Sequence, residues 1–421
     1  MPHWTRPAVL ALLLAGCAGP MPAPSSDGGA DAALRRAREL LRDAILVDGH
    51  NDLPWTIRSD KQAPGDVAAY DLRGTVSGQT DLKRLREGGV GAQFWSVYTP
   101  GEGERFAATQ LEQIDVARQL IARYPEALRA ASTAAEVRAA HKDGRIASML
   151  GIEGGHAIEN SLGALRAYYD LGVRYMTLTH NTHTDWADSA AQSPPKHDGL
   201  TPFGEKVVLE MNRLGMLVDL SHTSVATMDD ALRVSRAPVI FSHSAAAAVC
   251  PVPRNVPDAI LLKLKDNGGV IMVTFVAGFV DPDVAKVMQP LIEEFNRRAR
   301  RAKSEAERTK IFEDIQRRMN ATLPKTSIGR VADQLDYIRK LIGPAHLGLG
   351  ADFDGNDQWP EGLSDVSMYP NLFAELIRRG WSDADLRLLA GENVLRAMAR
   401  AEAVAAELQK TTPASTAKPG S

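Results

Sequence analysis

The chain of 421 residues contains only two cysteines, Cys17 and Cys250, and carries a net charge of only −3. Two cysteines cannot build a disulfide-rich scaffold, so stability must come from a hydrophobic core and any bound metal ions. The small negative charge argues against a nucleic-acid partner, which would require a strongly basic surface. No GxxxxGK[ST] or GxGxxG element opens a predicted helix, so the sequence offers no phosphate-binding loop. We expect Cys250 to be a small buried residue.

The N-terminal hydrophobic run, residues 8–15, is too short to span a bilayer and is typical of a signal peptide. It leads into Leu-Ala-Gly-Cys, the pattern of a bacterial lipoprotein signal in which Cys17 is lipidated; an ordinary signal peptide is the alternative. We therefore expect a signal peptide over residues 1–16, a flexible tether over residues 17–35 and a lipid anchor in a bilayer. Ala18 in place of aspartate favours the outer membrane, facing the periplasm, over the inner membrane.

Eight short segments are apolar on both faces, as in buried parallel strands, and they alternate with helix-like segments. Such repetition predicts one closed (β/α)8 barrel of the TIM type over residues 36–408. A doubly wound fold of two domains is the alternative, but it would divide the polar strand ends between two sites. The eight segments are residues 45–49, 90–98, 146–153, 173–179, 217–221, 238–242, 270–275 and 346–351.

Two further segments fall outside this alternation. A highly charged stretch at about residues 288–325 predicts an exposed helical insertion between the last two strands. Residues 409–421 are rich in Thr, Pro, Ser and Ala, a composition that predicts a disordered tail.

Most of the predicted strands end on a side chain that can bind a metal ion or transfer a proton. The carboxyl ends of barrel strands form the mouth in which active sites of this architecture lie. Alternate residues of a strand share a face, so the first histidine and aspartate of His-Asn-Asp point the same way. These side chains are His50, Asp52, Glu153, His180, His222, His243 and Asp352.

Five of these residues make up two sets of metal ligands if one of them is shared. Catalytic zinc normally has three protein ligands and an open position for water. Sharing Glu153 as a bridge gives each of two zinc ions three ligands. Two ions about 3.5–4 Å apart can activate a bridging hydroxide near neutral pH. No lysine ends a predicted strand, so Glu153 takes the place that a modified lysine has in other barrel hydrolases. The five ligands are His50, Asp52, Glu153, His222 and His243.

Between about residues 40 and 400 the sequence resembles the membrane dipeptidase family, also called renal dipeptidase. That family consists of dizinc (β/α)8 barrels that hydrolyse dipeptides. The resemblance implies that His50, Asp52 and Glu153 bind one zinc ion. It implies that Glu153, His222 and His243 bind the other, in agreement with the ligand count. The matching segments are VDGHNDLPW (47–55), GGVGAQFWSVYTP (88–100), GIEGGHAIE (151–159), RYMTLTHNTHTDWAD (174–188), VDLSHTSVATM (218–228), VIFSHSAAAAVCPVPRNVPD (239–258) and LGLGADFDG (347–355).

The resemblance also implies roles for two residues that would handle the substrate, His180 and Arg254. His180 would bind the substrate and stabilise the oxyanion as the bridging hydroxide attacks the scissile carbonyl. Arg254 would hold the free C-terminal carboxylate of the dipeptide, which a guanidinium matches in a bidentate way. We expect Asp352, the first residue after the last apolar run, to orient the hydroxide and pass its proton to the leaving amine. Asp354 is expected in a supporting or loop-capping role.

Some positions depart from the family pattern or stay undecided. Residues 333–337 lack an expected histidine, and the loop after the seventh strand (residues 276–279) has few polar side chains for substrate contacts. His156, His183 and His197 lie on mouth loops, where a scaffolding role is commoner than a substrate contact.

The expected function is zinc-dependent hydrolysis of dipeptides. One alternative is a dizinc amidohydrolase that acts on another amide or a lactam, and a more remote one is a non-catalytic binding lipoprotein. The sequence leaves the side-chain preference and the oligomeric state open, with a homodimer as one option.

Overall fold

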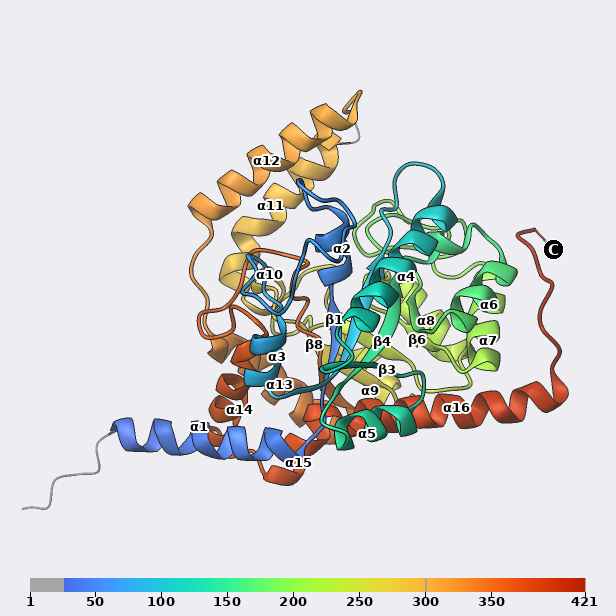
Figure 1. The fold of residues 1–421 in the computed structure, drawn as a ribbon. Helices are drawn as coiled ribbons and strands as arrows, with labels where there is room; N and C mark the ends of the chain where they lie inside the picture. Colours follow the sequence, from blue (N-terminus) through green and yellow to red (C-terminus); the bar gives the residue numbers. More distant parts are fainter. Residues whose placement is uncertain (1–25, 300, 421) are drawn as a thin grey trace, which may run out of the picture.

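A computed structural model describes residues 26–299 and 301–420, and its centre is a closed barrel of parallel strands (Figure 1). Neighbouring strands pair in the order β2-β1-β9-β8-β7-β6-β5-β4, and a further pairing of β2 with β4 closes the ring. The predicted TIM-type barrel is confirmed. Its strands are β1 (Leu46–Asn51), β2 (Val90–Tyr98), β4 (Ile146–Glu153), β5 (Val173–Thr177), β6 (Leu217–Asp219), β7 (Ile240–Ser244), β8 (Val270–Val273) and β9 (Leu347–Leu349).

One strand was not predicted. β3 (Leu128–Ala130) pairs only with the first three residues of β4 and does not belong to the ring. Three residues are too few to give the alternation or the apolar run that marks a strand in a sequence.

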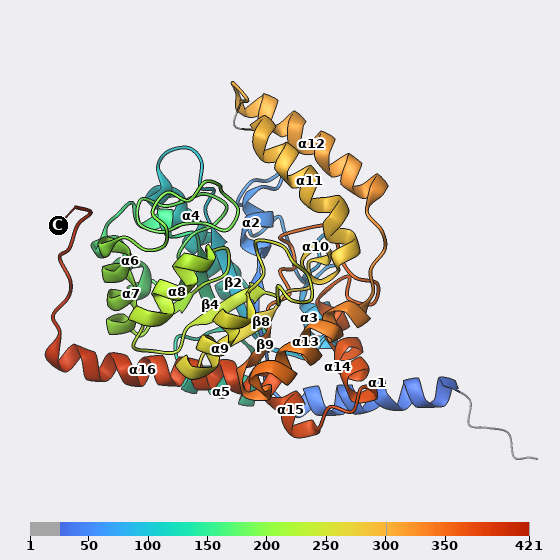
Figure 2. The ribbon, with the colours of Figure 1, turned by 180° about the vertical axis from the view of Figure 1, so that it is seen from behind.

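Helices surround the barrel, as both ribbon views show (Figures 1 and 2). Their ends follow local signals. Ser161, Thr201 and Ser224 each cap a helix by accepting a backbone N–H three residues on, and Gly215 ends α7 in the left-handed region. The helices are α1 (Ser26–Asp43), α2 (Leu53–Arg58), α3 (Leu82–Glu87), α4 (Phe106–Arg123), α5 (Ala134–Lys142), α6 (Leu162–Asp170), α7 (Pro202–Leu214), α8 (Val225–Val234), α9 (Asp258–Asn267), α10 (Ala277–Val280), α11 (Pro282–Ala299), α12 (Glu305–Thr322), α13 (Ile328–Ile342), α14 (Tyr369–Arg378), α15 (Asp383–Arg387) and α16 (Asn393–Thr411). Short helical turns are η1 (Gly155–Ile158), η2 (Pro344–His346), η3 (Val366–Met368) and η4 (Leu388–Glu392).

The charged stretch expected as an insertion at about residues 288–325 forms the two helices α11 and α12. They pack against each other as a hairpin that projects from the end of the barrel at which the strands finish (Figures 1 and 2). The hairpin has a hydrophobic cluster of its own, separate from the barrel core. Its buried members are Val276, Met288, Leu291, Ile311, Ile315 and Met319.

Part of the predicted N-terminal tether is helical. Residues 26–35 of the predicted tether (17–35) are the start of helix α1, which packs against α14. Ala33, Ala37, Leu40 and Leu41 are buried and lie on one face of this helix, and that burial explains why the segment is ordered. The predicted signal peptide and the predicted lipidation at Cys17 lie outside the described residues. In the part of the chain that the structure covers, no helix is long and apolar enough to cross a membrane.

The segment predicted as a disordered tail, residues 409–421, begins within a helix and makes contacts beyond it. Helix α16 continues to Thr411. Beyond it, the backbone carbonyl of Ser415 accepts a hydrogen bond from Arg166, and its N–H donates to Glu210. Side chains of α6 and α7 therefore bind the backbone of Ser415, a contact that composition alone cannot predict.

Candidate active site

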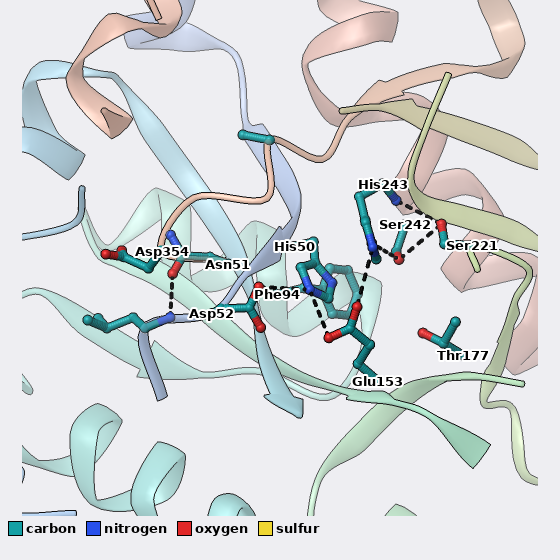
Figure 3. Close-up of polar contacts among 12 residues, drawn as sticks. His50, Asn51, Asp52, Phe94, Glu153, Thr177, Ser221, Ser242, His243 and Asp354 are labelled. Atoms are coloured by element: carbon teal, nitrogen blue, oxygen red, sulfur yellow. Dashed lines mark hydrogen bonds and ion pairs between the residues drawn. The ribbon is translucent and has the colours of Figure 1, made fainter. Parts of the chain in front are cut away.

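The carboxylate of Glu153, at the end of β4, is the centre of the site (Figure 3). Its Oε2 lies 3.7 Å from Nε2 of His50, while its Oε1 lies 3.0 Å from Nε2 of His222 and 3.4 Å from Nε2 of His243. Asp52 completes the first side, with 3.2 Å between its Oδ2 and Nε2 of His50. The two oxygens of Glu153 thus face two different groups of side chains.

All five predicted metal ligands are buried and converge at the carboxyl ends of the strands. His50 lies in β1 and His243 in β7, whereas His222 follows β6 by three residues. His222 and Asp352 have positive φ values of 65° and 71°. Residues other than glycine rarely adopt this backbone conformation, and those that do concentrate at functional sites.

Two of the histidines are oriented through their second ring nitrogen. Nδ1 of His50 lies 2.9 Å from the hydroxyl of Tyr175, and that hydroxyl also donates to the carbonyl of Gly49. The ring of Tyr175 fits inside the barrel because residue 151 is a glycine. A Cβ at Gly151 would overlap that ring. Nδ1 of His243 lies 2.8 Å from Oγ of Ser242. In both rings the contact of Nδ1 turns Nε2 towards Glu153.

The protonation states suit cation binding. Burial acts to raise the pKa of Glu153. His50 and His180 nevertheless hold this pKa well below its usual value. Burial lowers the pKa of His222 and of His243 well below the ordinary value, which keeps both rings neutral. Ionised carboxylates and neutral imidazoles are the forms that bind metal ions.

His50 differs from the other two histidines. Against the effect of burial, Tyr175, Asp52 and Glu153 raise its pKa well above the ordinary value. A cation that binds between His50 and Asp52 would therefore displace a proton.

The residues fit divalent cations. Nε2 of His50 and Oδ1 of Asp52 are buried and have no hydrogen-bond partner among the described residues. Imidazole nitrogens and carboxylate oxygens are the donors that zinc and similar ions prefer. Three groups bring their ligand atoms within 4.8 Å of one another: His50, Glu153 and His243; Glu153, His180 and His222; and His50, Asp52 and Asp352.

Arg254 lies beside these groups as a buried cation, with 7% of its surface exposed. Its Nη2 donates to the backbone carbonyl of His243, but its Nε and Nη1 have no partner among the described residues. Burial lowers the pKa of this guanidinium to about 10. No carboxylate of the described chain lies within ion-pair distance, so the guanidinium is left available for an anionic ligand.

His180 and Asp352, the other predicted site residues, lie on the open side of the cluster. Nε2 of His180 is 3.8 Å from Oε1 of Glu153, and 15% of its side chain is exposed. Its ring also contacts Tyr98, which in turn contacts Trp55. These aromatic rings form a wall at the mouth. Burial raises the pKa of Asp352 well above its ordinary value, and the charges of Asp52 and Glu153 add to the rise.

The three histidines whose roles the sequence left open all bind backbone carbonyls. Nε2 of His156 lies 2.8 Å from the carbonyl of Thr99, Nε2 of His183 lies 3.1 Å from that of Pro194, and Nε2 of His197 lies 3.1 Å from that of Thr184. These contacts make them part of the loop scaffold. Asp354 has a supporting role too, because it accepts the backbone N–H of Gln79.

Several contributors to the site gave no signal in the sequence. Tyr175, Asp219 and Phe279 look like ordinary core or loop residues there, since only the closed barrel brings them to His50, Ser242 and Arg254 respectively. Ser242 was visible as the neighbour of His243, but its contact with Nδ1 was not.

Comparison with known proteins agrees with this geometry. The family model "Membrane dipeptidase (Peptidase family M19)" matches residues 34–412. Dipeptidase verJ of Clonostachys rogersoniana is 42% identical over 394 residues, which cover 90% of each chain. Dipeptidase 3 of Rattus norvegicus is 41% identical and is matched over 89% of this chain and 69% of its own length.

Solved structures with the same fold include two bacterial proteins. One is a metallo peptidase from Rhodobacter sphaeroides liganded with a phosphinate mimic of the dipeptide L-Ala-D-Ala. It is 27% identical, with a TM-score of 0.70 over 85% of this chain and 100% of its own. The probable dipeptidase PvdM from Pseudomonas aeruginosa is 24% identical, with a TM-score of 0.76 over 89% of this chain and 99% of its own, and supports the fold alone.

The match over residues 34–412 and the relatives above 40% identity confirm both the resemblance and the expected enzyme class. The protein belongs to the membrane dipeptidase family, peptidase family M19, and is a dipeptide-hydrolysing metallopeptidase.

Proposed function

We propose that this protein hydrolyses dipeptides with two zinc ions bridged by Glu153. His50 and Asp52 would complete the ligands of one ion, and His222 and His243 those of the other. The division of the Glu153 oxygens between the two groups supports this assignment. When bound, such ions activate a water molecule near neutral pH and polarise the scissile carbonyl.

The observation that carries the substrate assignment is the buried guanidinium of Arg254, whose Nε and Nη1 have no partner in the described part of the chain. Burying a charge without a partner is costly, so such a group is normally matched by an ion of opposite sign. A dipeptide always brings a C-terminal carboxylate close to its single peptide bond. Arg254, beside the zinc ligands, would hold that carboxylate and so fix the distance from the chain end to the cleaved bond.

His180 and Asp352 would handle the charges that appear during hydrolysis. Burial lowers the pKa of His180, which leaves a neutral ring that can donate an N–H to the carbonyl oxygen as it becomes negative. Asp352 lies among other carboxylates and can therefore hold a proton, which it would pass to the leaving amine.

A screen of dipeptides on protein of measured zinc content tests the proposal. The panel contains L,L and L,D members, and each is also offered with its C-terminus amidated. We expect cleavage of free dipeptides, a loss of activity with chelator that zinc restores, and little cleavage of the amidated forms. Full activity after exhaustive demetallation would overturn the zinc assignment. Equal cleavage of amidated peptides would overturn the role of Arg254 and favour a general amidohydrolase.

We also propose that Cys17 is lipidated and anchors the protein in the outer membrane, facing the periplasm. The Leu-Ala-Gly-Cys sequence supports this assignment. Metabolic labelling of a bacterial host with an alkyne fatty acid should mark the full-length chain and not its Cys17→Ser variant. Equal labelling of both forms would contradict the proposal.

A further inference from the structure

Asp219, at the end of β6, is a fully buried carboxylate outside the set of proposed ligands. It accepts four hydrogen bonds. Two come from backbone N–H groups, those of Ser221 at 3.1 Å and Ser242 at 2.8 Å. The other two come from the hydroxyls of Ser242, at 2.6 Å, and Thr177, at 2.5 Å. Burial raises the pKa of Asp219, and its hydrogen bonds act against that rise. All four partners are donors, which is the set that satisfies an ionised carboxylate.

The hydroxyl of Ser242 also contacts Nδ1 of His243 at 2.8 Å (Figure 3). A hydroxyl has a single proton to donate. An ionised Asp219 can only accept, so that proton goes to Asp219, and Nδ1 of His243 must then be the donor to Ser242. Nε2 of His243 is left with its lone pair, and this atom lies 2.9 Å from Nε2 of His222 and 3.4 Å from Oε1 of Glu153.

We infer that Asp219 and Ser242 position His243 for metal binding, because they fix its ring and place its proton on Nδ1. This inference rests on the proposed function, in which His243 is a zinc ligand. Histidine ligands commonly donate their second N–H to an outer partner, which raises the basicity of the ligating nitrogen. Here the outer carboxylate acts through a serine. His222 has no such relay, since its Nδ1 has no partner in the described part of the chain.

The test measures zinc binding and needs no enzymatic activity. Demetallated wild-type protein and its Ser242→Ala variant are titrated with Zn²⁺ in competition with a chromophoric chelator. Losses from outer-partner variants are typically about 10–100-fold in metal affinity. We therefore expect wild type to bind two ions, and Ser242→Ala to bind one of them at least about 10-fold more weakly while keeping the affinity of the other.

Ser244→Ala is the matched control. Ser244 is also buried in β7, but its hydroxyl contacts only the hydroxyl of Ser221, among the described residues. We expect this variant to bind both ions as wild type does. Equal affinities in Ser242→Ala and wild type would overturn the inference. A wild-type protein that binds no Zn²⁺ would overturn the proposed function and the inference with it.

A double-mutant cycle tests whether Asp219 acts through Ser242. Asp219→Asn should weaken the binding of one zinc ion in the wild-type background. In the Ser242→Ala background it should add little to the loss of zinc affinity. Equal losses in both backgrounds would show that the carboxylate does not act through the serine. Thermal unfolding of each demetallated variant shows whether a loss of zinc affinity comes from misfolding.

Discussion

The guanidinium of Arg254 lies over the ring of Phe279, with 5.2 Å between Cζ and the ring centroid. Phe279 belongs to α10, directly before the α11–α12 hairpin, and it packs both on the hairpin cluster and beside Cys250. The backbone carbonyl of Phe279 also accepts a hydrogen bond from Asn255, the neighbour of Arg254. Helix α10 therefore contacts the guanidinium of Arg254 and also binds the loop that carries it.

Replacing Phe279 by Leu should raise KM for free dipeptides by about 3- to 10-fold with little change in kcat. The reason is the loss of a cation–π contact of about 0.5–2 kcal/mol that holds the guanidinium in place. Steady-state kinetics on the best dipeptide check this, with Phe279→Tyr as the conservative control. Zinc content should stay the same in both variants. A fall in kcat alone would mean that the ring does not act on substrate binding.

Removal of the guanidinium itself should have a larger effect. Arg254→Met keeps much of the buried side-chain volume but loses the charge, and we expect KM for a free dipeptide to rise by about 10- to 100-fold. For the C-amidated form of the same dipeptide, the variant and the wild type should differ little. If KM rises by the same factor for both substrates, Arg254 supports the fold and does not recognise the carboxylate.

Gly355 should not tolerate a side chain. A Cβ at this position would overlap Oδ2 of Asp52 and Oδ1 of Asp352. Both are ends of side chains, so Gly355→Ala should shift these carboxylates and leave the barrel folded. We expect zinc affinity and kcat to fall at least about 10-fold, with a small change in thermal stability. Gly74→Ala is the control, since its Cβ would meet only the carbonyl of Asp71, at 3.6 Å.

His156 should make the stability of the metal-free protein depend on pH. Burial lowers the pKa of His156 from 6.5 to about 4. The unfolded chain therefore binds more protons between pH 4 and 6.5, and stability falls as the pH drops through this window. The contribution is up to about 3 kcal/mol. Urea unfolding at several pH values should show a flatter profile for His156→Gln, which keeps a donor near the carbonyl of Thr99. Parallel profiles would contradict the assignment.

The barrel was predictable because its strands are short, apolar on both faces and regularly spaced. The metal ligands were predictable for a related reason: parallel strands bring their carboxyl ends together, so His50, Glu153 and His243 had to converge. Residues that support these ligands from other strands could not be found in this way. Nothing local distinguishes Tyr175 or Asp219 from core residues until the closed ring places them beside His50 and Ser242.

The helical start at residues 26–35 and the contacts of Ser415 could not be predicted from composition, for the same physical reason. Composition shows whether a segment can form its own core, but not whether another surface will bind it. Leu40 and Leu41 of α1 are buried in the main core, and Ser415 is held by Arg166 and Glu210. Both segments are ordered by partners that lie far away in the sequence.

Helix α1 lies at the end of the barrel opposite the mouth, while the α11–α12 hairpin rises on the mouth side (Figures 1 and 2). Leu46 begins β1, at the end of that strand remote from the site. Only two residues separate it from Asp43, the last residue of α1, so α1 must lie at the same end of the barrel. Enzyme coupled to a bead or an electrode through a group placed before Ser26 would thus present its mouth to the bulk solution. We expect such an immobilised sample to keep the KM of the free enzyme, whereas coupling through the hairpin should raise it.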